Sequence, residues 1–507
     1  MAVSAEQLAR EIESYLADHP NAIVVEGGET IFDFSSARYS LTPEREKCVL
    51  QIWSEERNVV RRVIGAELKN GSLRLSVVRF GQAQPARMEL CAEAERRAPS
   101  TLRVMRANYQ RTLHRILERT FPGWTVGKLS TSADLEHSFG PAYTRGVIHR
   151  GRSYLAVIGV GAGEAQPTVD AIVSIAVLWL EQCRERLSDR GHVEGAAVFV
   201  PAGRSFVPQL RLAHLHPDAA QWHLFATDES SETATRLALA DLANLETRLV
   251  QCPSREKTLA RFSSSVERIV ALAPLAEVVV VSASELSFRL HGLEFARADV
   301  TPEPGSFRLA ERITFGAAPA EFTLSDSTES FFQELVARLV QAREHRHRLD
   351  PLYRMHGERW LESIVKRDVS VLDDRLDSAC VYAQVPAFAA RDRAMIDLLG
   401  VTREGRLAVI ELKADEDVHL PMQGLDYWAR VRWHHRRGEF QKHGYFPGRE
   451  LSPLDPLLIM AAPALHVHPT TDALLRYLSP EIEWKLVGLD ERWRDQLRVV
   501  FRKKSRK

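Results

Sequence analysis

Alternating apolar and polar residues mark two stretches of this chain as strands joined by turns. One runs from Asn21 to about Cys91 and the other over about 276–324, and each predicts a small β-rich module. Apolar residues spaced as on one face of a helix predict amphipathic helices over 5–18, about 97–120 and 328–348. After each β-rich stretch, helical and strand patterns interleave, which is typical of α/β domains.

The order of these patterns predicts five parts along 507 residues, a length that is sufficient for several hydrophobic cores. The turn Lys69-Asn-Gly-Ser72 predicts a β-hairpin inside the first module. The predicted parts are a β-rich module (1–95), an α/β domain (96–232), a helical linker (233–275), a second β-rich module with its helix (276–348) and a second α/β domain (349–507).

Three charged residues stand at the end of an apolar hairpin in the second α/β domain. Asp397 lies in one apolar run, Glu411 closes the next, and the polar turn between them ends in Gly405. Side chains alternate along a strand, so Glu411 and Lys413 share one face while Leu412 turns to the other. Hairpin pairing can bring Asp397 alongside them. Such a cluster is costly to bury unless it holds a metal and performs chemistry.

The chemistry that suits these groups is hydrolysis of a phosphodiester. The carboxylates of Asp397 and Glu411 are hard ligands for Mg²⁺ or Mn²⁺, and the backbone carbonyl of Leu412 is a further candidate ligand. A bound ion would lower the pKa of its water and neutralise the phosphate. Lys413 would orient or deprotonate the attacking water, with its own pKa lowered by the ion.

This hairpin resembles the signature of the PD-(D/E)XK nuclease superfamily, which is an Asp followed after a spacer by Glu-x-Lys. Asp397, Glu411 and Lys413 take the three places of the signature. Ile396 stands where the family usually has proline, a frequent departure. The resemblance covers about residues 355 to 490 and implies a metal-dependent nuclease domain.

Two flanking features extend the resemblance. Gln423 and Tyr427 lie on one face of a helix and are similar to the QxxxY motif of the RecB-like and NucS-like branch, where it supports the site and contacts nucleic acid. The family also places an acidic residue on a helix before the hairpin. Glu362, embedded among apolar positions, takes that place and would be a further metal ligand, with Glu358 as the alternative.

The N-terminal half repeats the apolar pattern of this unit without its charges. Residues 154–162 match the second run, with Gly159 and Gly161 in place of the acid and the lysine. Arg145 stands at the offset of the first Asp, and His114 at that of the helix acid. Five matches in the same order indicate an internal duplication. The expected fold is α/β, a restriction-endonuclease-like mixed sheet flanked by helices, present twice, with each copy preceded by a small β-rich module.

The formal net charge is zero, from 67 basic and 67 acidic residues, so nucleic-acid binding requires a local basic face. The helix after the QxxxY motif offers one over 430–437, where Arg430 and Arg432 are candidates for nucleic-acid binding or site support. The alternative for this run is a solvated helical face. Residues 441–443 and the tail, 502–507, are further basic candidates.

The cysteines and the N-terminus bear on the compartment. The five cysteines are widely spaced and form no C-x-x-C pair, which fits a reducing cytoplasm and argues against disulfides or zinc. No signal peptide is apparent, and the most apolar helix, 172–180, is too short to cross a bilayer. The glycines near 159 lack the spacing of nucleotide-binding loops, so no small-molecule cofactor is expected.

These observations favour a Mg²⁺- or Mn²⁺-dependent DNA endonuclease acting in repair, restriction or defence. Two alternatives stay open, an RNA-cleaving nuclease of the same fold and a non-catalytic scaffold that binds nucleic acid. The β-module-plus-nuclease order resembles NucS-type enzymes, in which two subunits supply two sites. One active copy per chain implies nicking or single-strand cutting, unless the chain forms a homodimer.

Overall fold

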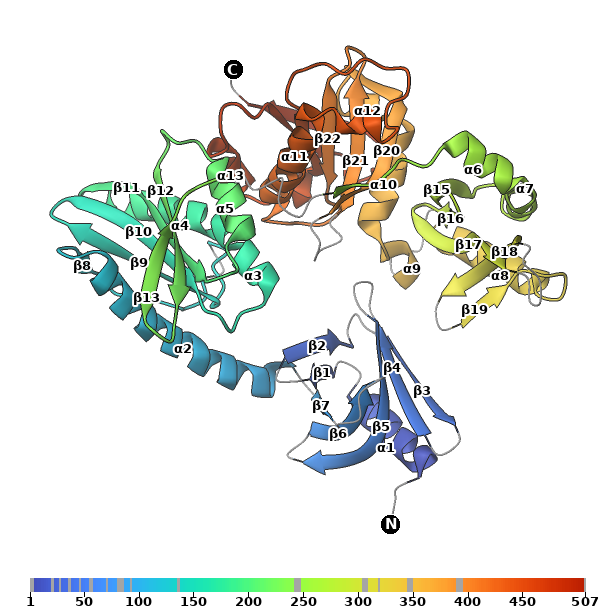
Figure 1. Ribbon diagram of the computed structural model, residues 1–507, viewed down its shortest axis with the longest axis horizontal. Coiled ribbons are helices and arrows are strands. Elements are labelled where there is room, and N and C mark those ends of the chain that lie inside the picture. The colour runs from blue at the N-terminus through green and yellow to red at the C-terminus, as the bar shows by residue number, and fades with distance from the viewer. Residues whose placement is uncertain are drawn as a thin grey trace. The chain divides into compact units, whose positions relative to one another are not determined.

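The computed structural model separates into two compact units, Met1–Asn108 and Tyr109–Lys507 (Figure 1). None of the helices in the described part of the chain is long and apolar enough to span a membrane. The structure describes residues 4–19, 22–26, 29–34, 38–44, 47–53, 58–69, 72–79, 86–91, 94–134, 137–240, 248–302, 309–317, 320–343, 350–388 and 395–505.

The first unit is an antiparallel sheet that packs against one helix. α1 (Ala5–Asp18) begins after Ser4, whose hydroxyl accepts a 3.2 Å hydrogen bond from the amide of Gln7 and caps the helix. The apolar face of α1 lies on seven strands in the order β2-β1-β7-β6-β5-β4-β3. The strands are β1 (Ile23–Glu26), β2 (Glu29–Asp33), β3 (Arg38–Glu44), β4 (Lys47–Trp53), β5 (Asn58–Lys69), β6 (Ser72–Arg79) and β7 (Ala86–Cys91).

The helix over 5–18 and the β-rich character of the first module are confirmed. β5 and β6 pair antiparallel with Lys69 opposite Ser72, as a hairpin requires. The two turn residues themselves, 70–71, lie outside the described residues.

The second unit begins with a six-stranded mixed sheet in the order β13-β12-β11-β10-β9-β8. The C-terminal part of α2 (Ala94–Thr120) packs on one face, where Leu113 and Ile116 join Val157 of the sheet in one core. α4 (Ile172–Leu187) packs on the other face, with α3 (Gln166–Asp170) and α5 (Phe206–Ala213) beside it. The strands are β8 (Thr125–Val126), β9 (Tyr143–Arg150), β10 (Ser153–Val160), β11 (His192–Pro201), β12 (Gln221–Asp228) and β13 (Thr233–Leu237).

A five-stranded antiparallel sheet, β15-β16-β17-β18-β19, forms the second β-rich module. Helices on its apolar face complete the core, in which Phe262, Phe288 and Phe332 are fully buried. The elements are α6 (Arg255–Arg261), α7 (Ser263–Leu272), β15 (Glu277–Ser282), β16 (Glu285–Leu290), β17 (Leu293–Pro302), β18 (Leu309–Ala317), β19 (Ala320–Thr323), α8 (Glu329–Arg343) and α9 (Pro351–Arg354).

A second mixed sheet of seven strands, β14-β20-β21-β22-β23-β24-β25, closes the chain. α10 (Gly357–Arg367) packs on one face, and α11 (Leu420–Arg436) and α13 (Thr471–Arg476) lie on the other. The remaining elements are β14 (Arg248–Leu249), β20 (Leu376–Phe388), β21 (Met395–Thr402), β22 (Leu407–Leu412), α12 (Glu439–Lys442), β23 (Leu457–Pro463), β24 (Trp484–Leu489) and β25 (Val499–Lys504).

The two mixed sheets repeat one order of strand directions. In the first, β9 and β10 are antiparallel, β11 and β12 follow in parallel, and β13 is antiparallel again. In the second, β21 to β25 show the same sequence of directions. By chain order, α4 corresponds to α11 and α5 to α13. The protein is therefore an α/β protein, as predicted.

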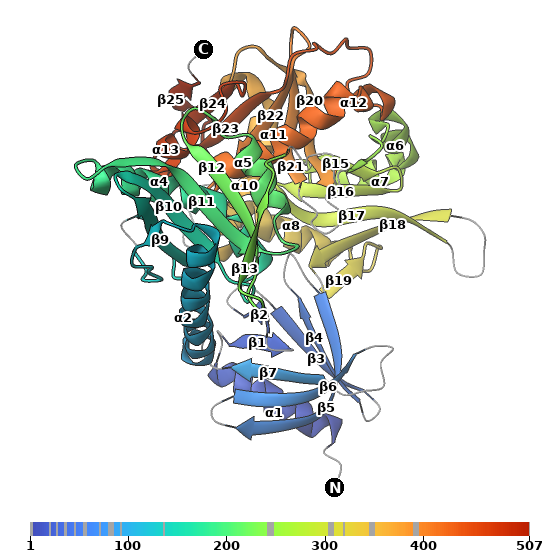
Figure 2. The ribbon, with the colours of Figure 1, turned by 60° about the vertical axis from the view of Figure 1, so that its left-hand side comes forward.

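The two mixed domains pack together through these corresponding helices (Figure 2). α4 contacts α13 and α11 contacts α5, and side chains from both domains merge in one hydrophobic core. Leu215, after α5, and Leu478, after α13, form an antiparallel backbone bridge. α4 thus contacts the counterpart of α5, and α11 contacts the counterpart of α13. A two-fold axis produces this arrangement.

The predicted helical linker is corrected by the structure. Within 233–275, β13 extends the first mixed sheet along β12, and β14 pairs with β20 at the edge of the second. The alternation in Thr233-Ala-Thr-Arg-Leu237 suits a strand, and an available sheet edge decides its structure. The helices in the described part of this stretch are α6 and α7, and they belong to the core of the second β-rich module.

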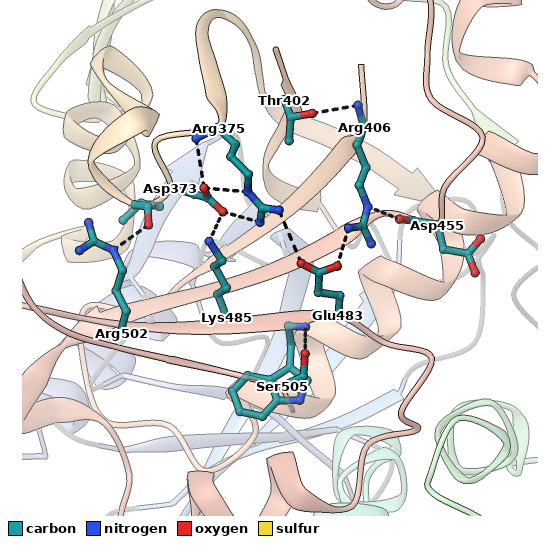
Figure 3. Close-up of polar contacts among 11 residues, drawn as sticks. Asp373, Arg375, Thr402, Arg406, Asp455, Glu483, Lys485, Arg502 and Ser505 are labelled. Carbon is teal, nitrogen blue, oxygen red and sulfur yellow. Dashed lines mark hydrogen bonds and ion pairs between the residues drawn. The ribbon is translucent and has the colours of Figure 1, made fainter. Parts of the chain in front are cut away.

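A network of charged residues fixes the second mixed sheet at the end where its parallel strands begin (Figure 3). The buried carboxylate of Asp373 pairs with Arg375 at 2.9 Å and with Lys485 at 2.5 Å. Burial alone would raise the pKa of Asp373, but these two hydrogen bonds hold it well below its usual range. Glu483 pairs with Arg406 at 2.6 Å. The network therefore joins the segment before β20 to the starts of β22 and β24.

Candidate active site

The hairpin of β21 and β22 carries two carboxylates side by side. Leu398 pairs with Ile410, so the next residues along each strand, Asp397 and Glu411, come level with one another. Oδ2 of Asp397 accepts a 2.9 Å hydrogen bond from the amide of Leu412, and the side chain of Leu412 is fully buried. The structure therefore brings together the acids that the alternation of the strand places on one face.

Burial dominates the electrostatics of this pair. The side chain of Glu411 is 3% exposed. Burial raises the pKa of both Asp397 and Glu411, and the charge of Asp397 raises that of Glu411 further. In the absence of a cation, the pair therefore retains a proton at a pH at which exposed carboxylates have lost theirs.

Lys413 follows the hairpin and points into the same cluster. Its Nζ lies 3.3 Å from Glu411, 3.5 Å from Glu358 and 4.0 Å from Asp417. Burial would lower the pKa of Lys413, but the surrounding carboxylates outweigh it and raise the pKa. The ammonium form is thus favoured when the carboxylates carry their charge. A bound cation would have the opposite effect on this pKa.

Both candidate acids of α10 face the site, in different ways. Glu358 is half-exposed and contacts Lys413, whereas Glu362 is 5% exposed. Oε2 of Glu362 lies 3.2 Å from a guanidinium nitrogen of Arg359 and also accepts a hydrogen bond from Gln384. Burial raises the pKa of Glu362 to about 7, because it outweighs the opposing effect of Arg359. Glu362 is therefore held by protein donors beside the carboxylate pair.

Gln384 is a site residue that the sequence pattern does not reveal. β20 pairs with β21 through Ala383–Leu398 and Val385–Ile396, so Gln384 lies opposite Asp397. Gln384 adopts φ +54, an uncommon left-handed conformation for this residue type. This irregularity lets its amide reach Glu362.

Three buried oxygens around the site have no hydrogen-bond partner among the described residues. They are Oε2 of Glu411, Oε1 of Gln384 and Oε1 of Gln423. Buried acceptors left without a donor are rare and costly, and a cation or ordered water satisfies them. Oxygen acceptors with two carboxylates suit Mg²⁺, which is commonly bound through one or two carboxylates and several waters. The residues present therefore fit such an ion.

The carboxylates do not by themselves enclose an ion. Among the described residues, no three His, Cys, Asp or Glu side chains converge as the ligands of a metal would. Asp397 and Glu411 are adjacent, while Glu362 is engaged by Arg359 and Gln384. A bound ion would thus have two carboxylates and backbone or water ligands, unless Glu362 exchanged its present partners for it.

The helix with the QxxxY motif brings Tyr427 toward the carboxylate pair. Burial raises the pKa of Tyr427, and the charges of Glu411 and Asp397 raise it further. Arg430, one turn beyond Tyr427, is only 5% exposed. Two roles are expected for Arg430, binding nucleic acid or supporting the site, and its burial favours the second. Arg432 is partly buried, and its guanidinium contacts Asp455 at 3.2 Å, His214 at 3.2 Å and the ring of Trp428.

The other basic candidates are largely paired with acids. Lys442 donates a 3.2 Å hydrogen bond to the carbonyl of Arg437, and the last tail residues, 506–507, lie outside the described residues. The run after the QxxxY motif thus offers little unpaired charge for a nucleic-acid backbone. The ion pairs are Arg436–Asp455 at 2.8 Å, Arg437–Glu439 at 2.6 Å and Lys503–Asp472 at 2.5 Å.

The corresponding place in the first mixed domain differs by one residue from the sequence prediction. Ile158 pairs with Arg145, and both lie on the face that packs against α4, the counterpart of α11. Arg145 therefore stands in the place of Asp397, and Ile158, not Gly159, stands in that of Glu411. The turn after β21 is one residue longer than the turn after β9, 403–405 against 151–152, and this shifts the register. Arg145 is instead buried over the ring of Phe139, where it donates hydrogen bonds to backbone carbonyls.

An aromatic ring fills the other face of the first hairpin. A Cβ atom on Gly159 would lie 2.5 Å from the hydroxyl of Tyr109 in α2, and one on Gly161 would lie 3.1 Å from its ring. The Tyr109 hydroxyl is buried, with no hydrogen-bond partner in the described structure. Gly159 therefore faces α2, whereas Glu411 projects with Val409 toward α11, so the two residues do not occupy the same place.

Comparisons with known proteins add little to these observations. No family model matches the chain, and no curated protein matches it. One solved structure, described as an EndoMS–dsDNA2 complex, aligns with 11% sequence identity over 45% of this chain and 96% of that chain. Its TM-score is 0.16, and a likeness at this level carries no argument about this protein.

Proposed function

We propose that this protein is a metal-dependent nuclease that hydrolyses DNA phosphodiester bonds at the site formed by Asp397, Glu411 and Lys413. The observation that carries the proposal is the buried carboxylate pair on two central strands of the sheet, beside a lysine and with Oε2 of Glu411 unsatisfied. A buried acidic pair with strongly raised pKa values is typical of functional sites. It destabilises the folded protein unless something compensates its charge.

In this proposal each residue has a separate role. Asp397, Glu411 and the backbone carbonyl of Leu412 would hold Mg²⁺ or Mn²⁺, which supplies charge neutralisation and an activated water. Lys413 Nζ, held by Glu411 and Glu358, would orient the attacking water and donate to the phosphate. Glu362 or Glu358 would complete the metal site or accept the proton of the water.

The QxxxY helix packs on the face of the hairpin from which Val409 and Glu411 project, and it would brace the site there. Tyr427 lies within the field of the carboxylate pair. Gln423, on the same helical face one turn earlier, directs a buried and unsatisfied Oε1 that suits a water or a substrate donor. The two side chains would therefore fix the position of the substrate strand relative to the hairpin.

We further propose that the two mixed domains are copies of one restriction-endonuclease-like unit and that only the second is active. Their common strand directions and the reciprocal packing of α4, α5, α11 and α13 support this proposal. Arg145, Ile158 and Val160, on the face that corresponds to that of Glu411, supply no metal ligand. The chain would thus contain the architecture of a dimer with a single site.

A single site predicts that supercoiled circular DNA is converted to the nicked form and that linear product does not accumulate. Each turnover breaks one strand, and a second cut opposite the first would require an independent event. Gel analysis of circular duplex and circular single-stranded DNA with Mg²⁺ or Mn²⁺ provides the measurement, with a matched RNA and EDTA as controls.

Asp397→Asn is the control variant for this assay, because it removes the charge without changing the shape of the side chain. Direct formation of linear DNA would contradict one site per molecule and indicate that two chains act together. Cleavage of RNA while DNA stays intact would identify RNA as the substrate. If neither were cut under any condition, the protein would be a scaffold and not an enzyme.

A buried ion pair joins the two proposed copies. Arg211 of α5 donates to both carboxylate oxygens of Asp426 in α11 at 3.0 and 2.8 Å, and to the carbonyl of Asp170. Asp426 lies between the two residues of the QxxxY motif. The first domain therefore holds the helix that braces the active site.

Arg211→Ala is expected to destabilise the second unit by about 3–5 kcal/mol, because it leaves a buried carboxylate without a partner. The double variant Arg211→Met with Asp426→Leu should recover most of this loss. Urea denaturation measures the difference. Arg312→Ala, which breaks an exposed pair with Asp299, is the control and should cost no more than about 1 kcal/mol. If Arg211→Ala and Arg312→Ala lowered the free energy of unfolding equally, this result would contradict the bracing role of the buried pair.

A further inference from the structure

The second β-rich module is fixed against the helix that carries Glu358 and Glu362. The turn between β16 and β17, His291-Gly292, has φ values of +48 and +76 and lies on α10. A Cβ atom on Gly292 would lie 2.3 Å from the carbonyl carbon of Arg359, so only glycine permits this approach. The ring of His291 lies 5.0 Å from that of Trp360. The position of β16 relative to α10 is therefore determined by close packing.

This packing places Arg289 of β16 beside the active-site helix. Its Nε donates a 3.0 Å hydrogen bond to the hydroxyl of Ser287, which in turn donates to Glu294 at 2.6 Å. The described structure records no partner for the two terminal nitrogens of Arg289. Burial lowers the pKa of Arg289, and the negative charge of Glu362 opposes that shift. The guanidinium therefore interacts electrostatically with the buried acid of α10.

Two further cations on α10 flank the same acid. Arg359 contacts Glu362 at 3.2 Å. Lys366 follows Glu362 by one helical turn, and the charge of Glu362 opposes the lowering of the Lys366 pKa by burial. The charge of Arg359 also acts on Asp397, and the other nearby acids are paired, so three cations face two carboxylates and positive charge is in excess. The paired acids are Glu277, with Arg367 at 2.5 Å, and Glu294, with Arg297 at 2.6 Å.

We infer that Arg289, Arg359 and Lys366 form a binding site for the phosphates of a nucleic-acid backbone, in which the second β-rich module supplies one of the three cations. This inference rests on the proposed function. Arginine presents a fork of donors that matches the oxygens of a phosphate, and a phosphate can replace Glu362 as the acceptor for Arg359. The strand would thus be held between α10 and β16 while its scissile bond lies at the hairpin.

The test measures binding and not cleavage. The full-length protein in EDTA is titrated into fluorescein-labelled single-stranded and duplex oligonucleotides of unrelated sequence, at salt concentrations from about 50 to 200 mM, and anisotropy gives the affinity. Arg289→Ala and Lys366→Ala should each weaken binding to all sequences and reduce the slope of log K against log salt by about one. Arg312→Ala, in the same module but paired with Asp299, should leave the slope unchanged.

A conservative variant separates binding from folding. Arg289→Lys keeps the charge and should retain most of the slope, whereas a purely structural role would not be rescued by lysine. If the wild-type protein binds and the alanine variants keep its full slope, this inference is overturned and the proposed function stands. If the wild-type protein binds no nucleic acid at all, the proposed function fails and this inference fails with it.

Discussion

Lys413→Ala should lower the rate of DNA cleavage by about 10²–10⁴-fold while the affinity for DNA stays nearly unchanged. The lysine is expected to position the attacking water, so its loss acts on the chemical step. Its side chain is only 12% exposed, and its charge is matched by Glu411 and Glu358, so it adds little to binding of the backbone. Single-turnover cleavage and anisotropy titrations with the same oligonucleotide measure the two effects.

Lys485→Ala is the matched control for this experiment, because Lys485 pairs with a buried acid of the same sheet at the end away from the site. At a temperature where both variants are folded, the control should still cleave. Parallel loss of binding and cleavage in Lys413→Ala would indicate a structural role for this lysine. Comparable loss of cleavage in both variants would point to destabilisation of the domain.

Glu411→Gln should stabilise the metal-free protein above neutral pH and remove its stabilisation by Mg²⁺. Burial raises the pKa of Glu411, so the folded state keeps a proton that the unfolded chain gives up above about 4.5. The free energy of unfolding therefore falls as pH rises from that value through the raised pKa values, including that of Glu362 at about 7. A neutral amide at position 411 avoids this loss.

The melting temperature reports both effects. The metal-free wild-type protein should melt at a lower temperature at pH 8 than at pH 5. Mg²⁺ at about 100 times its dissociation constant should restore about 2.7 kcal/mol, or several degrees. Glu411→Gln should melt higher than the wild type at pH 8 without metal and show no Mg²⁺ shift. The same Mg²⁺ shift in both proteins would place the ion elsewhere.

The site could be predicted from the sequence where its geometry follows from local periodicity. The two-residue repeat of a strand alone places Glu411 and Lys413 on one side, and a short hairpin then brings Asp397 to them. The sequence pattern places the counterpart of Glu411 in the first domain one residue away, at Gly159 and not at Ile158, because its position depends on one additional residue in a distant turn, which no strand pattern reveals. A register error of one residue exchanges an inward for an outward side chain.

Residues that depend on packing between elements could not be predicted. Gln384 reaches the site only because β20 departs from regular pairing, and Arg289 only because Gly292 permits a close approach between a turn and α10. Arg430 lies in a run that looks like an exposed basic face, but it is buried on α11, the helix that contacts α5 of the first domain. The sequence specifies this interface through apolar residues that resemble any other core.

The buried arginine of the first hairpin also bears on the changes open to this protein. Arg145 donates hydrogen bonds to the carbonyls of Gly140, Tyr143 and Ser132, so replacing it with aspartate would leave these buried acceptors without their donor. A first domain with a pair of carboxylates would therefore need new donors for its backbone before it could hold an ion.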